Sequence, residues 1–232
     1  MRLYIIRHAD PDYEHGTITP FGHEEAAALA QRLATEGIDR IYSSSMGRAL
    51  HTMEYTAKLL DKQPVILDWI REIEHEPVEF ADQGKMAAWD APGEMIFEHK
   101  LHFDGDNWIP FRHLEVIREK VERIRNESDR FLAGLGYERM GGRYSIRAPN
   151  RLKIALFCHG GFGLSWLSHL LQIPPILVWT GFWLPPSSVS TILFEERSAE
   201  WAVPRCLGLG DVSHLYAAGL TVRPRGLYGN LV

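Results

Sequence analysis

Cysteine is scarce in this sequence, and long apolar runs are absent. The only two cysteines among 232 residues are Cys158 and Cys206, too few for a disulfide framework, and Cys158 lies in an apolar run typical of a buried, reduced thiol. No window approaches the roughly 18 consecutive apolar residues of a membrane-spanning helix. The first apolar run reaches Arg7 too soon for a secretory signal. We therefore expect a cytoplasmic protein with no membrane partner.

An excess of positive charge is also missing. Lys and Arg number 25 against 30 Asp and Glu, which gives a formal net charge of -5. Nucleic acids and anionic membranes bind basic surfaces, so we expect neither as a partner, although a small basic pocket is still allowed. With 45% hydrophobic and 24% charged residues, the composition predicts one globular domain over residues 1–232. A homodimer is possible, but the sequence does not fix the oligomeric state.

Strand-like and helix-like segments alternate in the first third of the chain. Thr19 and Pro20 are a helix start signal, an N-cap followed by proline at the first helical position, and Gly37 is a stop signal. The expected order is strand, helix, strand, helix, strand, over residues 3–6, 19–37, 38–42, 46–60 and 65–67. This alternation predicts an α/β fold, a three-layer α/β/α sandwich around a mostly parallel sheet.

The pattern resumes near residue 109 after an irregular stretch. We expect a long amphipathic helix, a hairpin around Gly141-Gly142, a strand, a helix, two strands that could pair antiparallel at a sheet edge, and a coil tail; these are residues 109–135, 137–150, 152–158, 160–171, 188–194, 201–207 and 208–232. Residues 72–107 mix acidic residues, aromatics and prolines without a period. Long irregular segments are usually functional or mobile, so we expect this stretch to be an inserted lid.

Two strand-like runs, far apart in the chain, each end in a histidine. Arg7 and His8 follow the first run, His159 and Gly160 follow the second, and Arg48 lies in the first turn of the 46–60 helix. Ligands of open α/β sheets bind at the carboxyl ends of strands. Arginine forks and helix N-termini bind phosphate oxygens, and an imidazole with a free nitrogen can attack phosphorus. Each of these residues alone is more often structural; together they predict a phosphoryl site.

Five short motifs, in order, resemble those of the histidine phosphatase superfamily, also called the phosphoglycerate mutase-like family. Arg7-His8-Ala9 is similar to its Arg-His-Gly signature, and His159-Gly160-Gly161 to its second histidine motif. Between them lie elements similar to its Leu-Thr-x-x-Gly-x-x-x-Ala, Ser-x-x-x-Arg-Ala and Leu-x-Glu motifs, at residues 18–26, 41–49 and 69–73. The resemblance covers residues 2 to about 172.

The resemblance implies a role for each matching residue. His8 would be the nucleophile that forms a phosphohistidine, and Glu72 the acid that protonates the leaving alkoxide and then activates water. Arg7, Arg48 and His159 would bind the phosphoryl group, with Thr19 and Gly160 as further phosphate-binding positions. It implies no metal and no cofactor. The eleven histidines contain no His-Glu-x-x-His motif, and no Cys-x-x-Cys occurs, which also argues against a metal site.

The sequence departs from the family pattern at two places. Ala9 replaces the usual glycine, which should be tolerated if the backbone there has a negative φ. The Gly-x-Trp-Glu-Gly that often follows the acid is missing, so Glu74 and Glu76 rival Glu72 as the acid, with Asp10 as a more distant candidate.

The predicted function is hydrolysis of small phosphomonoesters. One alternative is a phosphoglycerate mutase, which the acidic run Asp10 to Glu14 disfavours because it would repel a diphosphate. Another is a non-catalytic module that binds a phosphorylated ligand, which would not need the nucleophile.

Overall fold

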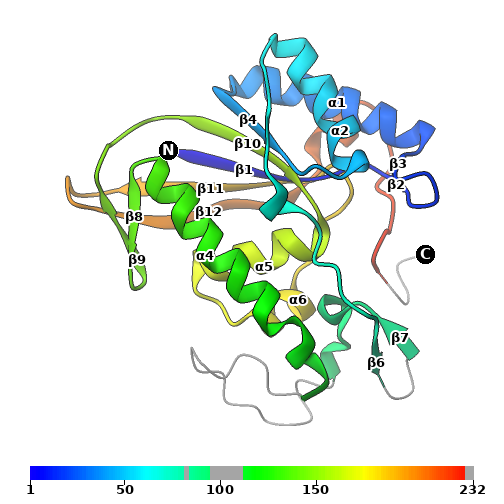
Figure 1. The fold of residues 1–232 in the computed structure, drawn as a ribbon. Helices are drawn as coiled ribbons and strands as arrows, with labels where there is room; N and C mark the ends of the chain where they lie inside the picture. The colour runs from blue at the N-terminus through cyan, green and yellow to red at the C-terminus, as the bar shows by residue number, and fades with distance from the viewer. Residues whose placement is uncertain (81–83, 95–111, 228–232) are drawn as a thin grey trace.

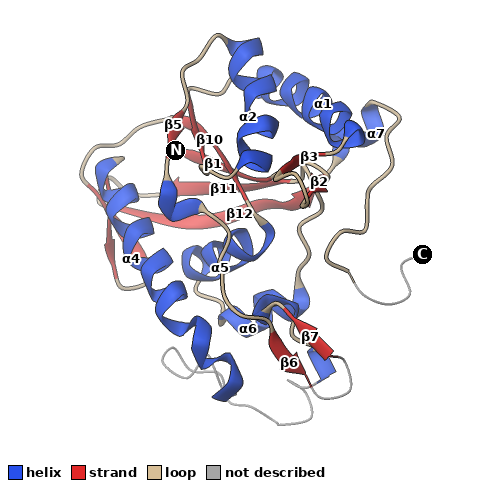
Figure 2. Ribbon diagram, turned by 45° about the vertical axis from the view of Figure 1, so that its right-hand side comes forward, coloured by secondary structure: helices blue, strands red, loops and turns tan. Residues whose placement is uncertain are grey.

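The computed structural model describes residues 1–80, 84–94 and 112–227. Its centre is an eight-stranded sheet in the order β5-β4-β10-β1-β11-β12-β9-β8. These strands span Val65–Ile66, Arg40–Ser43, Lys153–Cys158, Arg2–Arg7, Val189–Glu196, Trp201–Asp211, Arg143–Ile146 and Tyr137–Met140. Helices cover both faces of the sheet (Figures 1 and 2), as expected for an α/β/α sandwich. The predicted fold class is confirmed.

The sheet has a parallel half and an antiparallel half. β1 pairs in parallel with β10, β10 with β4, and β4 with β5. The predicted antiparallel pair is present as β11 and β12, but β11 lies beside β1 in the interior of the sheet. The Gly141-Gly142 hairpin forms β8 and β9 and joins the same sheet through β12. The antiparallel part is therefore larger than an edge pair.

One face of the sheet is covered by α1, α2 and α7 (Pro20–Glu36, Gly47–Leu60 and Ser213–Ala217). The predicted start and stop of α1 are confirmed: Thr19 accepts a hydrogen bond from the Gly22 amide, and Gly37 has a left-handed backbone with φ 74°. Leu29 and Leu33 of α1 pack with Met53 of α2 and with Tyr4 and Ile6 of β1. This core packs one face of β1 against α1 and α2.

The opposite face carries α4, α5 and α6 (Arg118–Gly134, Gly160–Leu171 and Pro175–Gly181). α5 is almost entirely buried because its residues from Gly161 to Leu170 are enclosed by the sheet, α4 and α6. The predicted 109–135 helix is shorter than expected: a 3-10 helix, η4 (Arg112–Ile117), precedes α4, and residues 109–111 lie outside the described residues.

The described part of the 72–107 stretch contains a small hairpin and a 3-10 helix. β6 (Val78–Phe80) pairs with β7 (Gly84–Met86), and η3 (Ala88–Asp90) follows. Phe97 and Phe103, which helped to predict a lid, lie outside the described residues. η1 (Asp68–Ile70) and the two-strand ribbon β2 (Pro11–Asp12) and β3 (Thr17–Ile18) complete the elements.

The prediction of a coil tail from residue 208 was wrong in part. β12 continues to Asp211, and α7 follows and packs against α1. Beyond α7 the chain has no regular structure up to Leu227, and it runs back past the ends of β1 and β3 (Figure 1).

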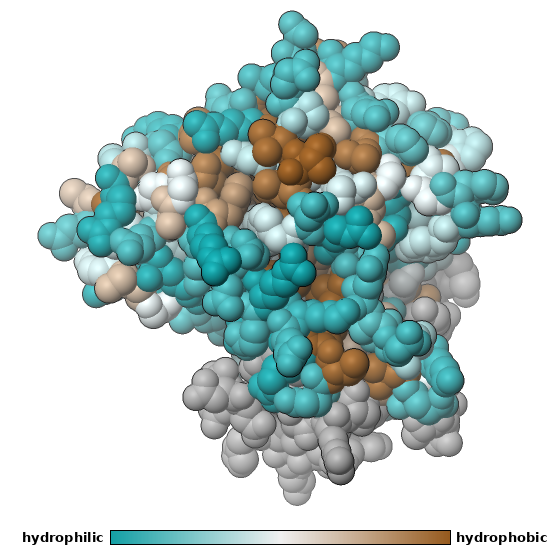
Figure 3. Space-filling view, viewed as in Figure 1, coloured by the Kyte–Doolittle hydropathy of each residue, from teal (hydrophilic) through white to brown (hydrophobic). Residues whose placement is uncertain are grey.

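The face seen in Figure 3 is mostly hydrophilic, with apolar atoms gathered where α2 leads into β5. Leu59 of α2 and Val65 and Ile66 of β5 are exposed. Within the described residues, no helix combines the length and apolarity needed to cross a bilayer.

Candidate active site

His8 lies directly after β1 and is 1% exposed. Its amide donates a hydrogen bond to the Cys158 carbonyl at the end of β10, and its carbonyl accepts one from the Ser187 amide. Its ring Nδ1 lies 2.8 Å from the Ala9 carbonyl oxygen. A carbonyl only accepts, so Nδ1 carries the proton and Nε2 keeps its lone pair. The backbone thus holds the neutral imidazole in the tautomer that a nucleophile needs.

His159 lies at the end of β10 and is fully buried. The ring centroids of His159 and His8 are 5.2 Å apart, so the structure brings together the two histidines predicted to meet. His159 Nε2 lies 2.8 Å from the Ser44 hydroxyl oxygen. Burial lowers the pKa of both histidines well below the usual value, and the Arg7 and Arg48 charges lower it further. Both imidazoles are therefore neutral at neutral pH.

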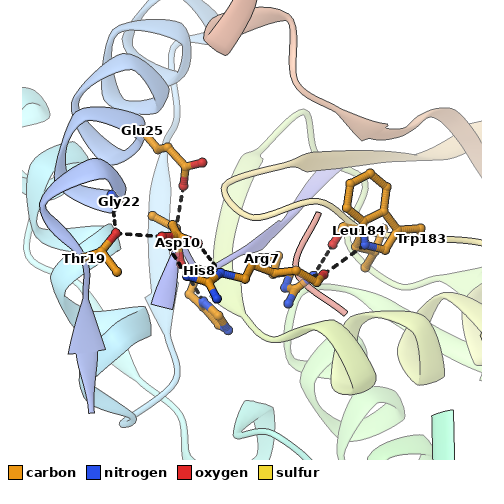
Figure 4. Close-up of polar contacts among 10 residues, drawn as sticks. Arg7, His8, Asp10, Thr19, Gly22, Glu25, Trp183 and Leu184 are labelled. Atoms are coloured by element: carbon orange, nitrogen blue, oxygen red, sulfur yellow. Dashed lines mark hydrogen bonds and ion pairs between the residues drawn. The ribbon is translucent and has the colours of Figure 1, made fainter. Parts of the chain in front are cut away.

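Arg7 is the last residue of β1, and its guanidinium reaches the Leu184 carbonyl (Figure 4). Its Nη1 donates to two backbone carbonyls, at 2.6 Å to Leu184 and 3.1 Å to Arg225. The chain of Gly160 lies against this guanidinium, since a Cβ at residue 160 would be 3.5 Å from Arg7 Cζ. Two backbone acceptors and a glycine therefore fix the position of this charge.

Arg48 lies in the first turn of α2, as predicted, and is 9% exposed. Its guanidinium carbon lies 5.5 Å from the centre of the Tyr13 ring. Burial lowers its pKa, and the neighbouring Glu72 carboxylate opposes this effect. The Arg7 charge also lowers the pKa of Arg48, and the Arg48 charge lowers the pKa of His8. Arg48 therefore shares one site with Glu72, Arg7 and His8.

Three buried nitrogen atoms of this cluster have no hydrogen-bond partner among the described residues: Arg7 Nε, Arg48 Nε and His159 Nδ1. Buried polar atoms are almost always paired in folded proteins, and each unpaired one costs about 1–3 kcal/mol. The guanidinium nitrogens can only donate, and His159 Nδ1 donates in one of its two neutral tautomers. Converging donors beside two permanent positive charges form a binding site for an oxyanion.

Glu72 caps the N-terminus of α5. Its Oε2 accepts a hydrogen bond from the Gly161 amide at 3.1 Å, and its Oε1 accepts from Phe162 at 2.8 Å and from Ile73 at 3.1 Å. The first helical amides of α5 would otherwise lack partners. Since Oε2 accepts only one of these three bonds, it keeps a lone pair that can hold a proton.

The rival carboxylates lie elsewhere. Glu74 is exposed and pairs with Arg71, and Glu76 is exposed. Asp10 is buried and forms an ion pair with Arg225, with 2.7 Å between Asp10 Oδ1 and Arg225 Nε. Of the four acids considered, Glu72 alone shares electrostatic contact with Arg48.

Asp10 connects the site to α1 (Figure 4). The Thr19 hydroxyl donates to Asp10 Oδ2 at 2.8 Å, and the Asp10 amide donates to Glu25 Oε2 at 2.7 Å. Glu25 is fully buried, and burial raises its pKa to about 7. Thr19 thus caps α1 and holds Asp10, and its predicted contact with phosphate stays a prediction, as does that of Gly160.

The alanine at position 9, where the family has glycine, causes no backbone strain, because its φ is not positive. Its amide donates to the Thr52 hydroxyl at 2.9 Å, which ties the His8 loop to α2. Among the described residues, no three His, Cys, Asp or Glu side chains gather closely enough to hold a metal ion.

A family model, the histidine phosphatase superfamily (branch 1), matches residues 3–205. The chain belongs to this superfamily. The match extends beyond the motifs, which ended near residue 172, and includes β11 and part of β12. The resemblance noted from the five motifs is confirmed.

Named relatives of this histidine phosphatase include a protein of Hydrogenobacter thermophilus called "Putative phosphoserine phosphatase 2", 28% identical over 171 residues, which are 69% of this chain and 73% of the relative. A phosphoserine phosphatase mutant of Entamoeba histolytica, solved with phosphoserine, has a TM-score of 0.61 at 20% identity over 92% of this chain and 98% of its own. A mycobacterial glucosyl-3-phosphoglycerate phosphatase solved with VO3 has a TM-score of 0.59 at 19% identity, covering 90% and 98%. At this identity the two structures establish the shared fold.

Several residues at the site were not predicted as functional. Ser44, which contacts His159, is the serine of the Ser-x-x-x-Arg motif, so a signal for it was present in the sequence. Arg225 and Trp183 come from segments without a motif, and the tertiary fold brings them to the site, where the Arg225 carbonyl accepts hydrogen bonds from both Arg7 and Trp183. Asp90 carries a pKa that burial raises to about 6, with Arg7 and Glu72 as its charged neighbours.

Proposed function

We propose that this histidine phosphatase hydrolyses phosphomonoesters through a phosphohistidine on His8. The observation that carries the proposal is the set of buried nitrogens without a hydrogen-bond partner among the described residues, Arg7 Nε, Arg48 Nε and His159 Nδ1, in the same cluster as His8, whose Nε2 keeps its lone pair. The superfamily supports a phosphatase, and the roles of individual residues are our assignment.

In the first step, His8 Nε2 attacks phosphorus and the bond from phosphorus to the alcohol oxygen breaks. The two arginines and His159 stabilise the charge on the three remaining phosphoryl oxygens, which is the main contribution a protein makes to this chemistry. Protonated Glu72 gives its proton to the departing alkoxide.

In the second step, water attacks the phosphohistidine, and Glu72, now ionised, takes a proton from that water. The bond between His8 Nε2 and phosphorus breaks, and inorganic phosphate leaves with His8 and Glu72 in their starting states. The tautomer held by the Ala9 carbonyl supports both steps because it keeps Nε2 available.

The test is to trap the intermediate. Wild-type protein is mixed with a phosphomonoester, quenched without acid, and analysed by mass spectrometry for phosphate on His8. We expect labelling in the wild type, none in His8→Ala, and a loss of turnover in the variant of more than about a thousandfold. His8→Asn serves as a second variant of similar polarity, and thermal unfolding checks that each folds. Full turnover in both folded variants would exclude the nucleophile assignment.

Product analysis separates the remaining alternatives. A phosphatase releases inorganic phosphate from one or more phosphomonoesters of a panel, a mutase converts 3-phosphoglycerate to its isomer, and a binding module does neither.

A further inference from the structure

A cavity of about 370 Å³ adjoins the proposed phosphate-binding cluster, which comprises Arg7, His8, Arg48 and His159. Its wall is formed by η3, by α6 with the residues after it, and by the end of the described tail. Gly226 of this wall lies against the Arg7 guanidinium, since a Cβ there would be 3.9 Å from Nη2. Trp183, also in the wall, is followed by Leu184, whose carbonyl accepts a hydrogen bond from Arg7. The cavity therefore begins where the proposed phosphoryl site ends.

The wall is rich in aromatic rings: Trp89, Trp179, Phe182 and Trp183. Two of the indole N–H groups donate within the protein, Trp179 Nε1 to the Ser165 hydroxyl and Trp183 Nε1 to the Arg225 carbonyl, each at 3.1 Å. The wall hydroxyl of Thr180 donates to the Ile176 carbonyl. With these polar groups engaged, the surface offered to a ligand is mainly ring carbon of the exposed Phe182 and the half-buried Trp89 and Trp183, while Trp179 is itself buried.

Asp90 is the only charged residue of this wall among the described residues. Its carboxylate has no hydrogen-bond or ion-pair partner in that part of the chain, although it is partly buried. Burial raises the pKa of Asp90 to about 6, and the Arg7 charge opposes this rise. A partly buried carboxylate without a partner is unfavourable, and a bound cation would offset that cost.

Aromatic rings around one carboxylate form the usual recognition site for substituted ammonium groups. Since the proposed phosphohistidine chemistry places the phosphoryl group beside Arg7, the alcohol part of the ester would extend into this cavity. We propose, as a refinement that rests on the proposed function, that the cavity binds the leaving alcohol and selects phosphomonoesters whose alcohol carries an ammonium group. Alcohols that carry a carboxylate are rejected, because Asp90 repels them and no basic side chain among the described wall residues receives them.

The experiment compares three esters: phosphocholine, its uncharged isostere 3,3-dimethylbutyl phosphate, and anionic 3-phosphoglycerate. In the wild type we expect kcat/KM for phosphocholine to exceed that of the isostere by about tenfold, the range of a desolvated cation with aromatic and carboxylate partners. The value for 3-phosphoglycerate should be lowest. Asp90→Asn should remove most of the preference, so that the ratio of kcat/KM for phosphocholine to kcat/KM for the isostere falls toward one, since the shape of the cavity and its rings are unchanged.

Glu79→Gln is the matched control, because Glu79 is exposed on β6 in the same segment and lies outside the cavity. It should leave all three values unchanged. Equal losses on all three esters in Asp90→Asn would assign Asp90 to proton transfer and overturn the proposal. A wild-type preference for 3-phosphoglycerate, or none at all, would overturn it as well.

Binding to His8→Ala, followed by tryptophan fluorescence, separates this inference from the proposed chemistry. If the wild type hydrolyses no ester but His8→Ala binds phosphocholine about tenfold more tightly than the isostere, the proposed function fails and the cavity assignment holds. If hydrolysis is normal and His8→Ala does not distinguish the two ligands, the cavity assignment fails and the proposed function holds.

Discussion

The phosphate-binding cluster and the adjoining cavity share a border at Arg7, but different kinds of structure build them. The cluster comes from the ends of β1 and β10 and the first turn of α2, and His8 and His159 are at most 1% exposed. The cavity comes from a 3-10 helix, a seven-residue helix and an irregular tail, and its Phe182 is 39% exposed.

This difference assigns different tasks to the two regions. Strand backbones in the sheet cannot shift without breaking ladder hydrogen bonds, so the groups at their ends keep a fixed geometry, as phosphoryl transfer requires. Connecting segments tolerate changes in sequence and shape. We infer that the cluster sets the chemistry and the cavity sets the range of esters, and the following variants test that division.

Glu72→Gln should give the largest effect. The side-chain oxygen of glutamine can still accept from Phe162 and Ile73, but its NH2 group can neither accept from Gly161 nor act as the acid, so kcat should fall by about 10²–10⁴ for alkyl esters. The loss should be much smaller for p-nitrophenyl phosphate, whose leaving group needs little protonation. Glu74→Gln, which alters an exposed acid paired with Arg71, is the control and should retain full activity. A loss confined to Glu74→Gln would move the acid to the rival position.

Arg48→Ala and Trp183→Leu compare the two regions directly. Loss of the Arg48 charge should lower kcat/KM by the same factor, about 10²–10³, for every ester, because all esters share the phosphoryl group. Trp183→Leu should change the order of preference among esters with a smaller loss, because Trp183 lines the cavity proposed for the alcohol. Steady-state kinetics on a panel of esters measures both, and an ester-dependent loss in Arg48→Ala would contradict the division.

The two regions also differ in how far the sequence predicted them. The His8 and His159 positions could be predicted because each follows an apolar run whose strand character is local, and Arg48 because its helix begins nearby. The contacts of Arg225 with Asp10 and Arg7 join residues more than 200 positions apart. No periodicity or motif marks such a pair, so the tail was predicted as coil and its role at the site was missed.

Asp90 was missed for a related physical reason. Its environment depends on burial by η3, α6 and the tail together, and none of these segments has a regular pattern. Helix α1, which packs against α2 beside the cluster, has by contrast local signals, the Thr19 cap and the Gly37 stop, which the structure confirms.

Glu25→Gln tests whether the buried carboxyl group that accepts the Asp10 amide lowers the free energy of unfolding. The pKa of Glu25 is about 7 in the folded protein, against an ordinary value of 4.5. The folded state therefore binds more protons between these values, and stability is lost as pH rises through this window. At pH 8 the variant should be more stable than the wild type by roughly 2–3 kcal/mol. At pH 4.5 the difference should be near zero.

Urea unfolding at the two pH values gives this difference, and comparison at equal pH cancels the titration of the buried histidines. The amide oxygen of glutamine can still accept the Asp10 amide hydrogen bond. Glu24→Gln, on the exposed side of α1, should show no pH-dependent gain. An unchanged stability of Glu25→Gln at pH 8 would show that the buried carboxyl finds compensation elsewhere.

Ser44→Ala should give the smallest effect and tests how the cluster orients its second histidine. The Ser44 oxygen accepts the Met46 amide at 3.2 Å, so its hydrogen can point to His159 Nε2, and the imidazole proton then lies on Nδ1, facing the phosphoryl site as a donor. Without the hydroxyl the tautomer is no longer fixed, and kcat/KM should fall by about 3–10-fold, the value of one hydrogen bond. Because the proposed function assigns His159 to the phosphoryl group, which all esters share, the loss should be equal for all of them. Ser45→Ala, whose hydroxyl contacts Asp68 and Arg71 instead, should have no such effect; equal losses in the two serine variants would mean that Ser44 supports the loop rather than the imidazole.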